Sequence, residues 1–125
     1  NVGRVLAQFD KMGVRDDTVI IFTADQGHNN GHHGLWGKGN ATIPFNMYEE
    51  SIRVPLIWNH RGRIKPGQRF PHMVSSYDFV PSLLDYVGVA APEDRHRAGT
   101  SYAPLLRGAA YQDRGELYFE YEYVR

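Results

Sequence analysis

The sequence of 125 residues predicts an α/β fold, and two observations point to it. Apolar residues at helical spacing open the chain and are followed, after a short polar turn, by the β-branched run Val19–Phe22. A second short apolar run, Val54–Trp58, comes before another helical pattern over Tyr77–Val87. Alternation of helices and strands is typical of a parallel sheet that is covered by helices.

The first helix is predicted from an apolar stripe and ends at Gly13. The run Val19–Phe22 is short, β-branched and bounded by polar residues, which is the pattern of a strand buried on both faces. In Val54–Trp58, Pro55 belongs at the start of the strand because proline cannot donate to the ladder. The stripe of the first helix consists of Val2, Val5, Leu6, Phe9 and Met12.

The second half of the chain carries weaker patterns. A turn is predicted at Pro66–Gly67, and the helix over Tyr77–Val87 should end at Gly88, where a left-handed residue is favoured. Ala90–Arg97 is interpreted as a polar connection. Glu116–Val124 partly alternates and is rich in aromatic residues, which predicts an edge or half-exposed strand.

Composition excludes several classes of protein. The chain has 14 basic and 14 acidic residues, so a surface that binds nucleic acid is not expected. Cysteine is absent, which excludes disulfides and thiolate metal sites but leaves the compartment open. No apolar run approaches the roughly 18 residues of a membrane span. The chain starts inside a helical pattern and stops on a strand-like one, so we expect residues 1–125 to be a single segment of a larger domain, truncated at both ends.

The loop after the first strand contains the side chains that could bind a ligand or take part in a reaction. Asp25 and Gln26 follow Val19–Phe22, and ligands of open α/β sheets collect at the carboxyl ends of strands. The loop runs from Asp25 to about Met47, and loops longer than about 15 residues are usually functional or disordered. It also contains three histidines and a lysine between two glycines: His28, His32, His33 and Lys38.

Two pieces of this loop have more than one interpretation. Asp25 and Gln26 offer carboxylate and amide oxygens, which hard cations such as calcium take as ligands, although an isolated pair of this kind more often forms a turn or caps a helix. Lys38 lies between Gly37 and Gly39 and can bind a tetrahedral oxyanion as a point charge, or simply be a solvated loop lysine.

The three histidines suggest a hypothesis of another class. Imidazole suits zinc or nickel, so the chain could be a small His-rich metal-binding module. Their spacing lacks the paired pattern of a zinc finger, and the neighbouring oxygen donors favour a harder ion.

Several motifs in order carry a family resemblance. They are Asp25–Gly27, His33–Lys38, Tyr48–Pro55, Ser75–Asp85, Gly99–Ser101 and Pro104–Leu106. Together they cover nearly the whole chain and resemble the sulfatases of the alkaline phosphatase superfamily. The resemblance implies an α/β fold that is a portion of an alkaline-phosphatase-like mixed, mainly parallel sheet with flanking helices. It also implies a sulfuric ester hydrolase.

The resemblance gives roles to five residues. Asp25 and Gln26 match the positions that bind the metal, usually Ca²⁺, although the family more often has Asn or His at the second position. Lys38 matches the lysine that contacts substrate, so it is the expected catalytic and substrate-binding residue. His33 is expected to orient the lysine loop and His28 to line the rim of the pocket, both as substrate-binding residues.

The resemblance also indicates what must lie outside this chain. Sulfatases carry their nucleophile in a Cys-x-Pro-x-Arg stretch whose Cys or Ser becomes formylglycine, and no such pattern is present here. We therefore expect formylglycine and the other metal ligands upstream, in the remaining part of the same enzyme. The expected substrate is a sulfated small molecule or carbohydrate, and a periplasmic, secreted or lysosomal location fits the family. Related phosphonate monoester and phosphodiester hydrolases share this loop and remain the alternative.

Other residues near the loop are expected to have structural roles. A buried Arg53 needs a carboxylate partner, and Glu49 and Asp78 are candidates. Asp78 also suits the first turn of its helix, where negative charge is favoured. Trp36 and Phe45 are expected to pack rather than to bind substrate, although either residue could flank a sugar.

Overall fold

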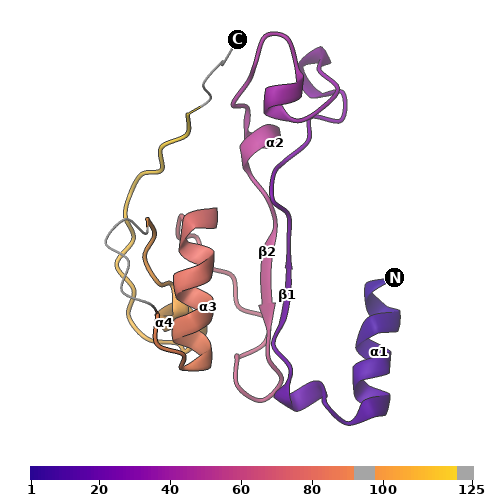
Figure 1. Cartoon of the computed structure of the whole chain (residues 1–125), viewed down its shortest axis with the longest axis vertical. Helices are drawn as coiled ribbons and strands as arrows, with labels where there is room; N and C mark the ends of the chain where they lie inside the picture. The colour runs from indigo at the N-terminus through magenta and orange to yellow at the C-terminus, as the bar shows by residue number, and fades with distance from the viewer. Residues whose placement is uncertain (92–97, 121–125) are drawn as a thin grey trace. The chain divides into compact units, whose positions relative to one another are not determined.

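A computed structural model describes residues 1–91 and 98–120 and confirms the α/β class. The α-helices and strands of the described residues, labelled in Figure 1, are α1 (Val2–Met12), β1 (Ile20–Thr23), α2 (Glu49–Ile52), β2 (Leu56–Asn59), α3 (Phe79–Val87) and α4 (Ala103–Leu106). The strands β1 and β2 pair with each other and run in opposite directions. None of the helices in the described residues has both the length and the apolar character needed to cross a membrane.

Helices α1 and α3 form where the apolar spacing predicts them, and each ends at the predicted glycine. Gly13 has φ of 70° and Gly88 has φ of 75°, a left-handed conformation that glycine adopts without a Cβ clash. Each glycine N–H bonds a carbonyl of the last turn, that of Asp10 or Asp85, at 3.1 Å. The predicted turn at Pro66–Gly67 is also present.

The prediction that Val19–Phe22 is buried on both faces is wrong for this chain. Strand β1 begins one residue later, its first two residues are half-buried, and Phe22 is 48% exposed. The reason is that the sheet formed by the described residues has two strands, which is too few to cover both faces of either one. Strand β2 also begins later than predicted, with Pro55 just before it.

The chain divides into two compact units, each with its own packing. One comprises residues 1–20 and 58–117, and the other comprises residues 21–57 with 118–120 of the described end. In the first unit, the ring of Trp58 lies 6.0 Å from Phe79, 5.7 Å from Tyr86 and 5.9 Å from Tyr102, measured between centroids. Burial raises the pKa of Tyr102 to about 12. The buried apolar residues of this unit are Tyr102, Ala103, Leu105 and Leu106.

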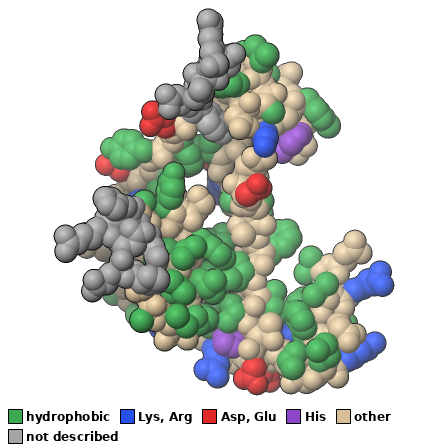
Figure 2. Space-filling model, in the orientation of Figure 1, with side chains coloured by type: hydrophobic (Ala, Val, Ile, Leu, Met, Phe, Trp, Pro, Cys, Tyr) green, Lys and Arg blue, Asp and Glu red, His purple; other side chains and the backbone are tan. Residues whose placement is uncertain are grey.

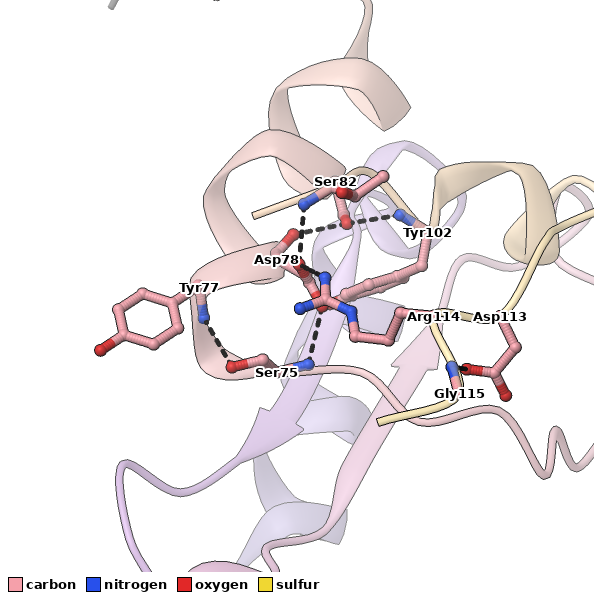
Figure 3. A network of polar contacts seen from close by, with 9 residues as sticks. Ser75, Tyr77, Asp78, Ser82, Tyr102, Asp113, Arg114 and Gly115 are labelled. Atoms are coloured by element: carbon pink, nitrogen blue, oxygen red, sulfur yellow. Dashed lines mark hydrogen bonds and ion pairs between the residues drawn. The ribbon is translucent and has the colours of Figure 1, made fainter. Parts of the chain in front are cut away.

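Asp78 is the polar centre of the first unit (Figure 3). Its carboxylate is fully buried and accepts hydrogen bonds from the backbone N–H of Ser75 at 2.8 Å and of Thr100 at 2.7 Å. The guanidinium of Arg114 pairs with the same carboxylate. The bond from Ser75 belongs to a capping box at the turn that leads into α3, so the expected role of Asp78 at the start of its helix is confirmed.

Two other expectations are wrong in part, and a third is mostly untested. Arg53 is exposed rather than buried, although Glu49 is its carboxylate partner at 3.9 Å as expected, and Asp78 is paired with Arg114. Residues 116–120 form no strand, because no described segment pairs with them, and residues 121–124 of that prediction lie outside the described residues. The polar connection Ala90–Arg97 lies mostly outside them as well, at 92–97.

Candidate functional site

The candidate site is a long loop of the second unit that is closed at its base by backbone contacts. The N–H of Gly27 donates to the carbonyl of Ser51, in α2, at 3.0 Å. A Cβ at Gly27 would lie 2.0 Å from the carbonyl oxygen of Glu50, so only glycine allows the start of the loop to approach α2 this closely.

Asp25 and Gln26 lie where the sequence predicts, two and three residues after the end of β1. Both are exposed, and their side chains form no hydrogen bond or ion pair with any described residue. Their oxygen atoms are therefore free for a ligand, and a carboxylate with an amide oxygen is a donor set that fits a hard cation. Among residues 1–91 and 98–120 there is no group of three or more His, Cys, Asp or Glu side chains placed to hold a metal.

Lys38 is half-buried and stands just before the short helical turn Gly39–Ala41. Its carbonyl accepts a hydrogen bond from the N–H of Ala41 at 2.9 Å. Gly37 before it has φ of 136°, which a residue with a side chain rarely adopts. The ammonium of Lys38 forms no ion pair or hydrogen bond with the described residues, so its charge is available.

Four buried polar side chains are joined by hydrogen bonds to one another, and the sequence analysis missed them. We call them the loop network: Asn29, Thr42, Asn46 and Ser51. The Asn29 side chain bonds the carbonyl of Gly37 and the Thr42 side chain that of Gly39, on either side of Lys38. No periodicity distinguishes such residues from ordinary polar loop residues, and the only sequence signal was the high content of Asn and Gly in a loop too long to be a simple connection.

The histidines are engaged with protein groups. Nε2 of His33 lies 3.0 Å from the carboxylate of Glu50 in α2, and its ring stacks on Tyr48 at 3.8 Å between centroids. Nδ1 of His32 lies 3.5 Å from the same carboxylate. The backbone N–H of Glu50 and the contact with His33 lower the pKa of the Glu50 carboxyl. His33 thus ties the lysine loop to α2.

His28 contacts a different part of the loop. Its ring meets Trp36 edge-on, with 5.9 Å between centroids, and its Nδ1 accepts a hydrogen bond from the N–H of Asn30 at 3.1 Å. Trp36 is 75% exposed, so apart from this contact with His28 the expectation that it packs is not met within the described residues. The physical reason is that its neighbours in the loop, His28 and Gly31, cover only a small part of the indole.

His33 also borders an open hollow with a volume of about 570 Å³. The rest of its lining is mostly apolar: Leu35, Pro44, Phe45, Asn46, Met47 and Tyr48. The structure therefore brings His33, but not His28, to the edge of a concave surface. No hydrogen bond or ion pair within the described residues joins Lys38 to Asp25 or Gln26. From their roles in the family we predict that the three side chains converge on the same side of the strand end.

Comparison with known proteins identifies the family. Residues 31–125 match the family model described as N-sulphoglucosamine sulphohydrolase, C-terminal. The chain belongs to the sulfatase family. This sulfatase chain is 37% identical to an N-acetylglucosamine-6-O-sulfatase of Bacteroides thetaiotaomicron. The match covers 98% of this chain and 21% of that relative. It thus spans about a fifth of the length of that relative.

Solved structures place the sulfatase chain in the alkaline-phosphatase-like fold. One is the structure of a protein in complex with its substrate, D-glucosamine-2-N,6-O-disulfate. The match covers 96% of this chain and 24% of that protein, with a TM-score of 0.71 and 34% identity. Another is the phosphonate monoester hydrolase of Agrobacterium radiobacter, which matches 90% of the chain and 21% of that protein, with a TM-score of 0.73 and 30% identity. The family and fold expected from the motifs are confirmed.

Proposed function

We propose that the protein containing this chain is a sulfuric ester hydrolase, and that the chain supplies one metal-binding edge and one sulfate-binding lysine. A single observation carries the proposal. In one loop that follows β1, the oxygens of Asp25 and Gln26 and the ammonium of Lys38 have no partner among residues 1–91 and 98–120, while the backbone around Lys38 is bonded on both sides.

Asp25 and Gln26 are the residues of this chain that would hold the divalent cation, for which we propose Ca²⁺. Their oxygens fit it, and two donors are a minority of the six to eight oxygens that calcium usually takes. The remaining ligands belong to other parts of the enzyme. When bound, such a cation supplies positive charge that stabilises anionic oxygens of the reacting group.

Lys38 is proposed to bind the oxygens of the sulfate group and to stabilise the charge that develops on the bridging oxygen as the S–O bond breaks. The nucleophile is proposed to be a formylglycine outside this chain. Because a flexible ammonium acts as a point charge, its effect depends on where the loop backbone places it. The Glu50 contact of His33 restrains one side of that loop.

The substrate class that we propose is a carbohydrate sulfate. Support comes from the matched structure that holds a glucosamine disulfate and from the hollow beside His33, where Tyr48 and Phe45 offer aromatic surface to a sugar. We place His33 at this substrate-binding hollow and His28 at the rim of the lysine loop.

The alternative with a specific observation behind it is a phosphonate monoester or phosphodiester hydrolase, because one such hydrolase matches the chain with a similar TM-score. The His-rich metal module has less support, because His33, His32 and His28 contact Glu50 or Trp36 in the structure.

The test uses the complete protein that contains this chain. It is assayed with a chromogenic aryl sulfate, an aryl phosphonate monoester and an aryl phosphodiester, before and after chelation and with calcium added back. We expect the largest kcat/KM with the sulfate and a loss on chelation that calcium restores. A larger kcat/KM with the phosphonate or phosphodiester would overturn the sulfatase proposal in favour of the alternative.

A further inference from the structure

We propose that the loop network fixes the backbone from which Lys38 reaches its anion, and that Asn29 and Thr42 are positioning residues for that lysine. The inference rests on the proposed function, because it takes Lys38 to be the group that binds sulfate. It adds the residues through which the chain places the ammonium.

The first step is the position of the anchor points. The Gly37 carbonyl, directly before Lys38, accepts two hydrogen bonds from Asn29, one from its backbone N–H at 2.9 Å and one from its side-chain Nδ2 at 3.0 Å. The Gly39 carbonyl, one residue after the lysine, accepts from the N–H of Asn46 at 3.1 Å and lies 3.1 Å from the Thr42 hydroxyl, whose single proton it shares with the Pro44 carbonyl at 2.8 Å. Lys38 is therefore held from both sides.

The second step is that the two anchors are connected. Nδ2 of Asn29 also donates to the hydroxyl of Ser51 at 2.9 Å, and that hydroxyl donates to Oδ1 of Asn46 at 2.5 Å. Nδ2 of Asn46 in turn donates to the Thr42 hydroxyl at 2.7 Å. These hydrogen bonds form one continuous chain, and the donors and acceptors along it fix the orientation of the side-chain amides of Asn29 and Asn46.

Burial of the four side chains restrains the loop network. The exposed fractions of the four side chains are 0% for Asn29, 5% for Thr42, 8% for Asn46 and 2% for Ser51. Water does not compete for these bonds, and a buried polar group that loses its partner is costly, so the network favours one arrangement. By contrast, the Lys38 side chain takes no part in it and is only half-buried.

The third step separates this role from general closure of the loop. The loop is attached to α2 by other contacts, namely the N–H of Gly27 on the Ser51 carbonyl and the ring of His33 on Glu50. The network also includes Ser51 of α2 and the Pro44 carbonyl, but unlike these other contacts it reaches the two carbonyls beside the lysine, those of Gly37 and Gly39. Hydrogen bonds to the carbonyls of Gly37 and Gly39 restrain the backbone of Lys38. A restrained backbone limits the positions that the flexible ammonium can reach.

The experiment is a double-mutant cycle in the complete protein. Thr42→Val removes the hydroxyl with little change in size, Thr42→Ser keeps it, and each is combined with Lys38→Ala. We expect Thr42→Val to lower kcat for an aryl sulfate by about 10-fold or more, since a displacement of about 1 Å can cost on the order of 10²-fold. Thr42→Ser should stay within about 2-fold of wild type. In the Lys38→Ala background, Thr42→Val should cause no further loss.

Control variants separate positioning from folding. Thr18→Val also removes a hydroxyl that bonds a backbone carbonyl, that of Val14 at 2.7 Å, and should leave kcat unchanged. Asn29→Asp tests the other end of the network without changing size, because it replaces the amide donor by an oxygen. The folded fraction of every variant is measured by circular dichroism, so that kcat is expressed per folded molecule.

Two results would overturn the inference, and they differ. If Lys38→Ala lowers kcat but Thr42→Val and Asn29→Asp do not, or if their losses multiply with that of Lys38→Ala, the network does not act through the lysine. If Lys38→Ala keeps wild-type turnover, the role of Lys38 in the proposed function is wrong, and the inference falls with it.

Discussion

At the scale of single residues, the site depends on side chains that have no partner among the described residues: Asp25, Gln26 and Lys38. The backbone beside Gln26 is held at Gly27, and that around Lys38 is held at Gly37 and Gly39, so freedom of these side chains is combined with restraint of the main chain.

Lys38→Ala in the complete protein should lower kcat for an aryl sulfate by roughly 10²-fold or more, because it removes a charge that acts at the reacting centre. Stability should change little, since the ammonium makes no bond within the described residues. Steady-state kinetics and thermal unfolding measure the two effects. Lys65→Ala, in an exposed turn, is the matched control, and near wild-type turnover of Lys38→Ala would remove the catalytic role.

Asp25→Ala should reduce the amount of calcium that copurifies with the complete protein, because it removes a carboxylate from the shell. Gln26→Ala should have a smaller effect, since an amide oxygen carries no net charge. Metal content is measured by mass spectrometry after gel filtration in calcium-free buffer. Unchanged calcium in Asp25→Ala would show that the metal is bound by other residues. Asp17→Ala, in an exposed turn before β1, serves as control.

At the scale of elements, close backbone contact sets the geometry of the loop. Gly27→Ala should destabilise the complete protein by about 1–3 kcal/mol, because its Cβ would meet the Glu50 carbonyl at 2.0 Å and push the loop from α2. Gly3→Ala is the matched control: nothing lies within 4 Å of its Cβ, and alanine favours a helix, so α1 should be slightly stabilised. Thermal unfolding compares the two, and equal stability of Gly27→Ala and wild type would contradict the observed contact.

The connection between α3 and α4 should depend on pH. The hydroxyl of Ser101 and the guanidinium of Arg107 bond Asp85 and lower the pKa of its carboxyl. Because the pKa is lower in the folded state, the stabilisation is complete above the ordinary value of about 4 and is lost as pH falls through the folded value. Asp85→Asn should therefore lower the Tm at pH 7, and the difference from wild type should shrink below pH 4. A constant difference down to pH 2.5 would exclude this charge effect.

The elements also show why some features follow from sequence and others do not. Helix α3 with its terminal Gly88 is encoded locally, by spacing and by a glycine that accepts positive φ. Burial is not local. The residues of β1 have the pattern of a buried strand and yet Phe22 is largely exposed, because burial depends on neighbours that two strands do not provide.

The candidate site also contains residues that the sequence predicts and residues that it does not predict. Asp25 and Lys38 are recognised from the motifs around them, and the position of Asp25 after β1 follows from strand geometry. The loop network could not be predicted, because its bonds join residues up to 22 positions apart through side chains with no periodic signal. Likewise, the partner of Asp78 is Arg114, 36 residues away, which no local pattern connects to it.

At the scale of the whole molecule, the chain carries apolar side chains that its own packing does not cover. Figure 2 shows hydrophobic side chains on the visible surface. The exposed large ones include Val2, Val5, Met12, Phe22, Trp36, Ile43 and Ile57. None of the α1 residues is buried. Because the chain spans about a fifth of its relative, we expect the rest of the same enzyme to cover much of this surface.

The 125-residue chain alone should hydrolyse no sulfate ester. Catalysis needs an activated nucleophile, and none of the serines or threonines of this chain lies in the nucleophile pattern of the family. Asp25 and Gln26 alone should bind calcium weakly, since about six to eight oxygens normally surround it. With two paired strands and exposed apolar residues, the isolated chain should also be poorly soluble.

The measurement is expression of residues 1–125, addition of calcium and detection of the phenol released from a chromogenic aryl sulfate. The Lys38→Ala form of the same chain is the control for background hydrolysis, and calorimetry with calcium measures its affinity. We expect equal, near-zero rates for the two forms, because the lysine can stabilise charge only when a nucleophile attacks the sulfur. Turnover that is reproducibly higher than in the Lys38→Ala form would show that the chemistry is complete within residues 1–125, and the proposal of a nucleophile and metal ligands elsewhere would be wrong.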